Sequence, residues 1–221
     1  LYGTIEVQQI GTRLYLSCSV PFNVEVLDND LMRVMQGTVN DVTKLPLQCK
    51  DGYIVKVSNT RMSDEDDYYV KFAGQNGQDG VGVWQECAKP GITKSFKAST
   101  MPHILQRQSI SGSNPVIFVV KPFEYTDRNV GDDITCPIPS FVGAGINKVI
   151  FFRNRLVFLS GENVICSRPG SINKPNFWNN SALTIGAIDP VDISCASLYP
   201  SDLFDGIETT TGLLCFSSNQ Q

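Results

Sequence analysis

The chain has 221 residues, of which 42% are hydrophobic and 18% charged, and its net charge is −4. This composition is that of a folded protein with one large domain or two small ones. The acidic balance, without a block of Lys or Arg, argues against a protein that grips nucleic acid through its phosphates, but it is compatible with a conduit for nucleic acid. No apolar run is long enough to span a membrane, and no signal peptide is recognisable. Because the chain begins at Leu1 without an initiator Met, we expect it to be a piece of a longer polypeptide.

The first ninety residues are predicted to form strands with one short helix among them. Alternating and β-branched residues predict strands over residues 4–9, 13–20, 23–27, 53–57, 68–72 and 81–87. The pattern from Val39 to Pro46 predicts a short helix, with Asn40 or Thr38 as N-cap and Pro46 as its stop. A small α+β unit is therefore expected over about residues 20–92.

Residues 93–136 are polar and rich in turn residues. Only Val116–Val120 reads as a strand there, and residues 109–114 are predicted to form a hairpin tip.

Three short apolar runs, 148–152, 156–159 and 164–167, are separated by two polar turns and predict a tight β-meander. In the middle run Phe158 and Leu159 point to opposite faces, and both are apolar, so the sheet should be covered on both sides. A stack of sheets, as in a propeller or a sandwich, supplies such cover. Glu162 is expected to be a turn residue whose loss costs little stability. Further strands are predicted over residues 192–197 and 212–217.

The seven cysteines are widely spaced, odd in number and free of any Cys-x-x-Cys pair. Without a signal peptide, this argues against a disulfide framework. We expect most of them to be reduced and buried as small apolar residues, as Cys166 illustrates within its apolar strand.

The residues that could carry chemistry are few. His103 is the only histidine, which excludes His-pair zinc sites and most His-based triads, so it is expected to be a loop or packing residue. Residues 64–67 are consecutive acids and lack the spacing of a calcium loop, which favours a solvated loop over a cation site or a subunit contact. The pair Asp132 and Asp133 could suggest glycoside hydrolysis, but neighbours on a strand point to opposite faces, so no catalytic role follows.

Several other features leave two interpretations open. Arg153 and Arg155 fit a solvated turn or an interface with an acidic partner. Phe177 and Trp178 fit a lid over the edge of the meander or a stacking surface for a sugar. The Gly-rich stretch, which contains Gly74, Gly77, Gly80 and Gly82, lacks the Gly-Lys-Ser/Thr ending of a phosphate loop and is predicted to be a long hairpin tip.

A collinear set of motifs over about residues 45–221 resembles the tail tubular protein B family, the tail nozzle proteins of short-tailed phages. The most specific is Phe-Phe-Arg-Asn-Arg-Leu-x-Phe-Leu-Ser-Gly-Glu-Asn-Val from Phe151, followed by Asn-Phe-Trp from Asn176. The other matching pieces, in order, are 68–72, 82–87, 90–92, 100–103, 128–133 and 139–143.

This resemblance implies a mainly β fold, with a small α+β insertion-like domain at 1–125 and a β-meander, part of a propeller-like body, at 126–221. It implies a structural virion protein without enzymatic activity, cofactor or metal: a subunit of a hexameric nozzle ring that extends the genome ejection channel. The implied partners are further copies of itself, the portal-adaptor tail protein, tail fibres and double-stranded DNA passing through the lumen without sequence-specific binding. The implied location is the virion tail, assembled in the host cytoplasm.

The alternative is a carbohydrate-binding or carbohydrate-degrading tail module that acts on the host surface. It rests on Trp84, Phe177, Trp178 and scattered carboxylates. Such a module needs a cleft in which an aromatic ring and two carboxylates converge, whereas a conduit does not.

Overall fold

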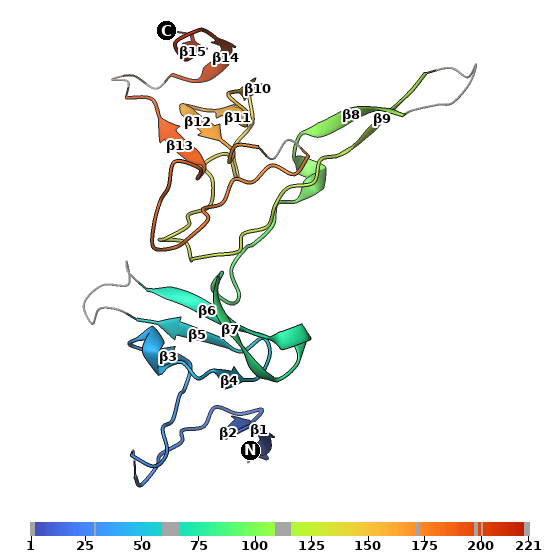
Figure 1. The fold of residues 1–221 in the computed structure, drawn as a ribbon. Helices are drawn as coiled ribbons and strands as arrows, with labels where there is room; N and C mark the ends of the chain where they lie inside the picture. Colours follow the sequence, from blue (N-terminus) through green and yellow to red (C-terminus); the bar gives the residue numbers. More distant parts are fainter. Residues whose placement is uncertain are drawn as a thin grey trace. The chain divides into compact units, whose positions relative to one another are not determined.

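The protein was analysed as a computed structural model that describes residues 3–28, 30–58, 67–108, 116–170, 173–196, 199 and 201–218. Within these residues the chain is mainly β, with fifteen strands and three single 3-10 turns (Figure 1). It divides into two compact units. The first unit comprises Leu1–Pro90 and Val130–Thr135, and the second comprises Gly91–Asn129 and Cys136–Gln221.

The first unit is built on a five-stranded sheet with the order β3-β5-β6-β7-β4. Its strands are β3 (Thr38–Val39), β4 (Gln48–Cys49), β5 (Ile54–Val57), β6 (Tyr68–Gly74) and β7 (Gly80–Cys87). Tyr68, Val70 and Phe72 alternate onto the buried face of β6, which is the period-2 pattern of a half-buried strand. A separate hairpin pairs β1 (Glu6–Ile10) with β2 (Arg13–Ser17). The predicted strands at 4–9, 13–20, 53–57, 68–72 and 81–87 are confirmed with small shifts at their ends.

Two local predictions for this unit are wrong. The helix expected between Val39 and Pro46 is only a 3-10 turn, η1 (Val42–Lys44), whose N-cap is Asp41, because its carboxylate accepts a hydrogen bond from Thr43 N at 2.8 Å. The strand expected over residues 23–27 is an irregular segment in the structure.

The Gly-rich stretch is a hairpin tip, as predicted. The 3-10 turn η2 (Gln75–Gly77) links β6 to β7, and Asn76 and Gly77 adopt positive φ angles of 59° and 68°. A Cβ atom on Gly82 would collide with the carbonyl oxygen of Ala73, so the close approach of the two strands requires glycine there.

The second unit contains the predicted meander. β10 (Lys148–Phe152), β11 (Arg155–Ser160), β12 (Asn163–Cys166) and β13 (Val191–Ser194) form an antiparallel sheet in chain order. Arg153 and Asn154 connect β10 to β11 with φ angles of 44° and 64°, the backbone of a tight primed turn. The predicted strands at 148–152, 156–159 and 164–167 are confirmed, and the one at 192–197 is shorter and earlier, with Ser197 outside the described residues.

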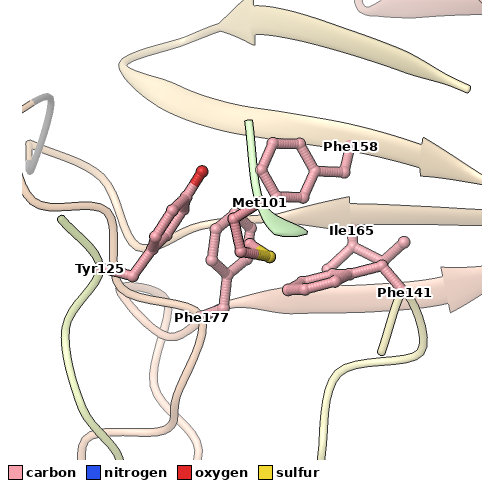
Figure 2. Close-up of a cluster of buried hydrophobic side chains, with 6 residues drawn as sticks. All are labelled: Met101, Tyr125, Phe141, Phe158, Ile165 and Phe177. Atoms are coloured by element: carbon pink, nitrogen blue, oxygen red, sulfur yellow. The ribbon is translucent and has the colours of Figure 1, made fainter. Parts of the chain in front are cut away.

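Both faces of β11 are buried, as the apolar pattern predicted. Val157, Phe158 and Leu159 are each 0% exposed. Phe158 and its cross-strand partner Ile165 face a cluster with Met101, Tyr125, Phe141 and Phe177 (Figure 2). Val157 and Leu159 face the opposite side, where they pack with Leu203.

The cover on that opposite side is a second hairpin. It pairs β14 (Leu203–Glu208) with β15 (Leu213–Ser217), and Leu213 and Cys215 pack against the cluster of Val157, Leu159 and Leu203. β15 confirms the strand predicted at 212–217, whereas β14 was not predicted. Irregular aromatic segments therefore cover one face of the sheet and a hairpin covers the other.

The remaining strands are β8 (His103–Gln108) and β9 (Ile117–Pro122), which pair as a two-stranded ribbon. β9 matches the strand predicted at 116–120, and β8 was not predicted. The 3-10 turn η3 (Ala98–Thr100) precedes β8. The predicted tip at 109–114 lies outside the described residues.

The two compact units divide after Pro90, with a short return of the chain at residues 130–135. Residues 91–125 belong to the second unit because Phe96, Met101 and Tyr125 pack into its aromatic cluster. Residues 130–135 return to the first unit, where Lys89 N donates to Gly131 O at 2.9 Å. The assignment of 1–125 as an insertion-like domain stays a prediction.

Arg155 holds the loops that follow the meander. Its Nη1 donates to the carbonyl oxygens of Ser167 and Asp189, and its Nη2 donates to that of Ala187, each at 2.8 Å. Arg153, in the same turn, donates to the Thr211 carbonyl oxygen at 3.4 Å, and its guanidinium carbon lies 5.1 Å from the Phe152 ring centroid. Both sequence interpretations of Arg155, a solvated turn and an intersubunit contact, miss this internal role.

The two-sided burial of β11 predicts that Phe158→Ala and Leu159→Ala each lower the free energy of unfolding of the second unit by about 2–5 kcal/mol, through lost burial and a cavity. Denaturant unfolding would be followed by the fluorescence of Trp178 in a Trp84→Phe background, so that only this unit reports. If only one of the two substitutions is destabilising, one face of β11 is open.

The matched control is Phe151→Ala on the adjacent strand, where the side chain is 50% exposed and the cost should be about 1 kcal/mol or less. Glu162 is unsuitable as a control, because its side chain makes a hydrogen bond to the backbone. Its Oε1 accepts a hydrogen bond from the backbone N–H of buried Ser201 at 2.7 Å.

The Arg155 contacts predict a contrast within one turn. Arg155→Ala should lower the free energy of unfolding by about 2–3 kcal/mol, because three carbonyl oxygens lose a charged donor. Arg153→Ala should cost about 0.5 kcal/mol or less. Equal unfolding midpoints in urea for the two variants would contradict the structural role of Arg155.

Candidate functional site

The described residues offer little for catalysis. No group of three or more His, Cys, Asp or Glu residues among them is arranged to hold a metal ion. His103 is exposed as the first residue of β8, so it is a strand residue rather than the loop or packing residue that was expected, and its Nδ1 lies 2.9 Å from the Met101 carbonyl oxygen. None of the helices in this part of the chain is long and apolar enough to cross a membrane.

The adjacent acids Asp132 and Asp133 lie in different environments, one buried and one exposed. Asp132 is buried, and its Oδ1 accepts hydrogen bonds from the backbone N–H groups of Ile134 and Thr135, both at 3.1 Å. Burial alone would raise the pKa of Asp132, but these hydrogen bonds and nearby Lys89 outweigh it and lower the pKa. Asp133 is exposed. Asp132 therefore stabilises a turn and stays ionised.

The acidic run at 64–67 falls largely outside the described residues, which include only Asp67. Asp67 is 1% exposed and pairs with Lys56 Nζ at 2.6 Å. The prediction of a solvated loop is therefore wrong for Asp67, whose buried carboxylate pairs with the partly exposed Lys56 just before β6.

Phe177 and Trp178 are core residues. They are 3% and 1% exposed, the Phe177 ring stacks on Phe158 with centroids 4.8 Å apart, and the Trp178 ring stacks on Phe96 at 4.9 Å. The guanidinium carbon of Arg128 lies 5.3 Å from the Trp178 ring centroid. The two rings therefore belong to the aromatic cluster that covers one face of the meander, not to a lid over its edge, and their burial excludes a stacking surface for sugar on them.

Trp84 belongs to the first unit and is half-buried. Its Nε1 donates to the Pro46 carbonyl oxygen at 2.8 Å, and its ring meets Phe72 edge-on at 5.2 Å. The contacts of Trp84 tie β7 to the segment before β4, so its role in the structure is packing.

The cysteines are all free, but most are not fully buried. Only Cys49 and Cys136 are buried, four are half-buried, and Cys195 is exposed. The prediction that most would be core residues is therefore wrong. Burial raises the pKa of Cys49, Cys136, Cys166 and Cys215, which keeps these thiols protonated and weakly nucleophilic.

Two hollows lie on the second unit. The larger, about 690 Å³, is lined by apolar and small residues such as Met101, Phe141 and Ile146, without any carboxylate. The smaller, about 310 Å³, brings Glu124 and Asp127 together with Phe123 and Tyr125. Burial raises the pKa of Tyr125 to about 12. Both acids of this smaller hollow are exposed, and sequence reasoning did not single them out.

The largest unexplained feature is the ribbon of β8 and β9. Every residue of β9 is exposed, and five apolar residues at or next to this strand are between 40% and 67% exposed: Val116, Ile117, Phe118, Val119 and Val120. Leu105 on β8 is 66% exposed. Exposed apolar strands of this kind mark surfaces that bind another protein.

Comparison with known proteins agrees with these observations. The family described as bacteriophage nozzle protein matches residues 18–221. The tail tubular protein gp12 of Escherichia phage T7 is 34% identical to this chain over 179 residues, which cover 81% of the chain and 21% of that protein. The chain thus spans about a fifth of the length of the curated relative it matches. The chain is mainly β, it exposes apolar strands, and the family matches it from residue 18 to residue 221. It therefore belongs to the bacteriophage nozzle protein family.

Proposed function

We propose that this chain is part of a subunit of a phage tail nozzle, a structural ring that extends the channel through which the genome leaves the virion. The match to the nozzle family over residues 18–221 carries this proposal. The similarity to a tail tubular protein supports a location in the virion tail, after assembly in the host cytoplasm.

The fold of the second unit supports membership of a propeller-like body. Its four antiparallel strands follow one another in chain order, which is the arrangement of a propeller blade. The hairpin of β14 and β15 packs on one face of this sheet, as a neighbouring blade would. In this proposal residues 1–125, which include most of the first unit, are an insertion that decorates the body.

The charge of the chain suits a conduit. A net charge of −4 disfavours tight binding to the DNA phosphates, so double-stranded DNA can pass without being retained. The partners in this proposal are further copies in a ring, as a hexamer, together with the portal-adaptor protein and the tail fibres. The nozzle acts without catalysis, cofactor or small-molecule substrate.

A carbohydrate-binding or carbohydrate-degrading module is the second candidate. Its support is the hollow in which Glu124 and Asp127 lie beside Phe123 and Tyr125. At about 310 Å³ this hollow is at the small end of ligand sites. The burial of Phe177 and Trp178 removes two of the three aromatic residues that suggested this function.

An amber codon in place of Tyr53, in the phage that encodes this chain, distinguishes the two candidates. On a non-suppressing host, we expect heads filled with DNA whose tails lack the distal tube in negative-stain micrographs, with loss of infectivity. The matched control is the same phage on a host with a tyrosine-inserting suppressor, which restores the unchanged protein.

Complete tails on the non-suppressing host would contradict the nozzle proposal. Complete tails combined with loss of activity on host polysaccharide would support the carbohydrate module instead.

A further inference from the structure

Charge is segregated along the second unit. Residues 91–123 contain four Lys or Arg and no acid, whereas residues 175–221 contain five acids and no Lys, Arg or His. The basic residues are Lys94, Lys97, Arg107 and Lys121, and the acidic ones are Asp189, Asp192, Asp202, Asp205 and Glu208. Asp189 is buried, but the other four acids are exposed, and each segment also carries exposed apolar strands, so the unit presents two surfaces of opposite charge.

The basic hairpin, β8 with β9, concentrates apolar residues on one face. Leu105 lies opposite Val120, and Arg107 lies opposite Phe118, so these four side chains share a face. Leu105, Phe118 and Val120 are 58–67% exposed. A two-stranded ribbon on its own is marginally stable in water, so this face calls for a partner that covers it.

We call the exposed strands β13 and β14 of the acidic segment the acidic surface. Val191 pairs with Cys166 on β12, which in turn pairs with buried Val157 on β11. Ile193, Val164 and buried Leu159 form a second row of the same kind. Val191 and Ile193 therefore lie on the face of the sheet against which β14 packs. β13 is nevertheless exposed at the open edge of the sheet, with Val191 at 38% and Ile193 at 58%.

Strand β14 also combines exposed apolar residues with acidic ones. Phe204 and Ile207 are more than half exposed beside Asp205 and Glu208. Asp205 pairs with Lys148 at 2.9 Å, whereas Glu208 makes no ion pair with any described residue. Glu208 is therefore the acid on this strand that remains available to a basic partner.

We propose that the basic hairpin of one copy docks on the acidic surface of a second copy of this chain. This inference rests on the proposed ring and names the contact that builds it. The complementary charge and the exposed apolar side chains of the two surfaces select a second copy as the occupant. Because different surfaces meet, the contact is head-to-tail, and repeating it closes a ring when the rotation allows.

The proposed contact is small for a protein interface. Six strand residues span about 20 Å, so one face of the two-stranded hairpin covers roughly 200 Å². A stable pair of proteins buries about 800 Å² on each partner. One such contact is therefore weak, so association of the chain through it is expected only at the upper end of a concentration series.

Sedimentation velocity over a concentration series tests the contact with the full chain. Arg107→Glu and Glu208→Arg each place like charges at the contact and should raise the concentration of half-association at least about tenfold. The chain that carries both substitutions should recover association, because the charge pair is exchanged. All these positions are exposed, so the thermal midpoint should stay unchanged and report intact folding.

The matched controls are Arg33→Glu and Glu25→Arg, which make the same charge changes at exposed positions of the first unit. They should associate as the wild type does.

The outcomes separate this contact from the proposed function. Association of the wild type that neither reversal weakens would overturn the contact and leave ring assembly intact. Weakening by both reversals without recovery in the double variant would overturn the pairing of these two surfaces. A wild-type chain that stays monomeric at every concentration would overturn the contact and count against self-assembly as well.

Discussion

The burial of β11 on both faces is the constraint on which the second unit depends. Val157, Phe158 and Leu159 follow one another and are each 0% exposed, so neighbouring side chains that point in opposite directions both need apolar cover. The cover comes from distant parts of the chain: Phe141 and Phe177 on one side and the β14–β15 hairpin on the other. A single sheet thereby organises most of the unit, and its irregular segments are fixed by packing rather than by regular structure.

Charged side chains bind the backbone groups of the loops in the second unit. Arg155 binds three backbone carbonyls in the loops after the meander, and the Asp189 carboxylate accepts hydrogen bonds from Asn180 N at 2.8 Å and Gly186 N at 2.7 Å. Loops without their own secondary structure need such partners for their backbone groups. The polar interactions of this unit therefore hold its loops in place. This suits a structural protein whose contacts with other molecules lie on its exposed strands.

The sequence predicted the meander because its three runs are strongly apolar and its turns carry Asn and Gly. It did not predict β8, whose Gln106, Arg107 and Gln108 are polar, or β14, which Gly206 weakens as a strand. The burial of Phe177 and Trp178 and of Asp67 depends on contacts with residues far away in the chain, which a local pattern cannot encode. The overestimated helix at 39–46 shows tertiary context overriding a plausible cap and stop.

Native-state amide hydrogen exchange tests the two-sided burial most directly, because it reports local stability residue by residue. The amides of β11 should exchange only when the whole second unit unfolds, so their free energies of opening should equal its global free energy of unfolding. The amides of the exposed β8–β9 hairpin should exchange orders of magnitude faster in the unassociated chain. Exchange of the β11 amides at the rate of that hairpin would contradict the account.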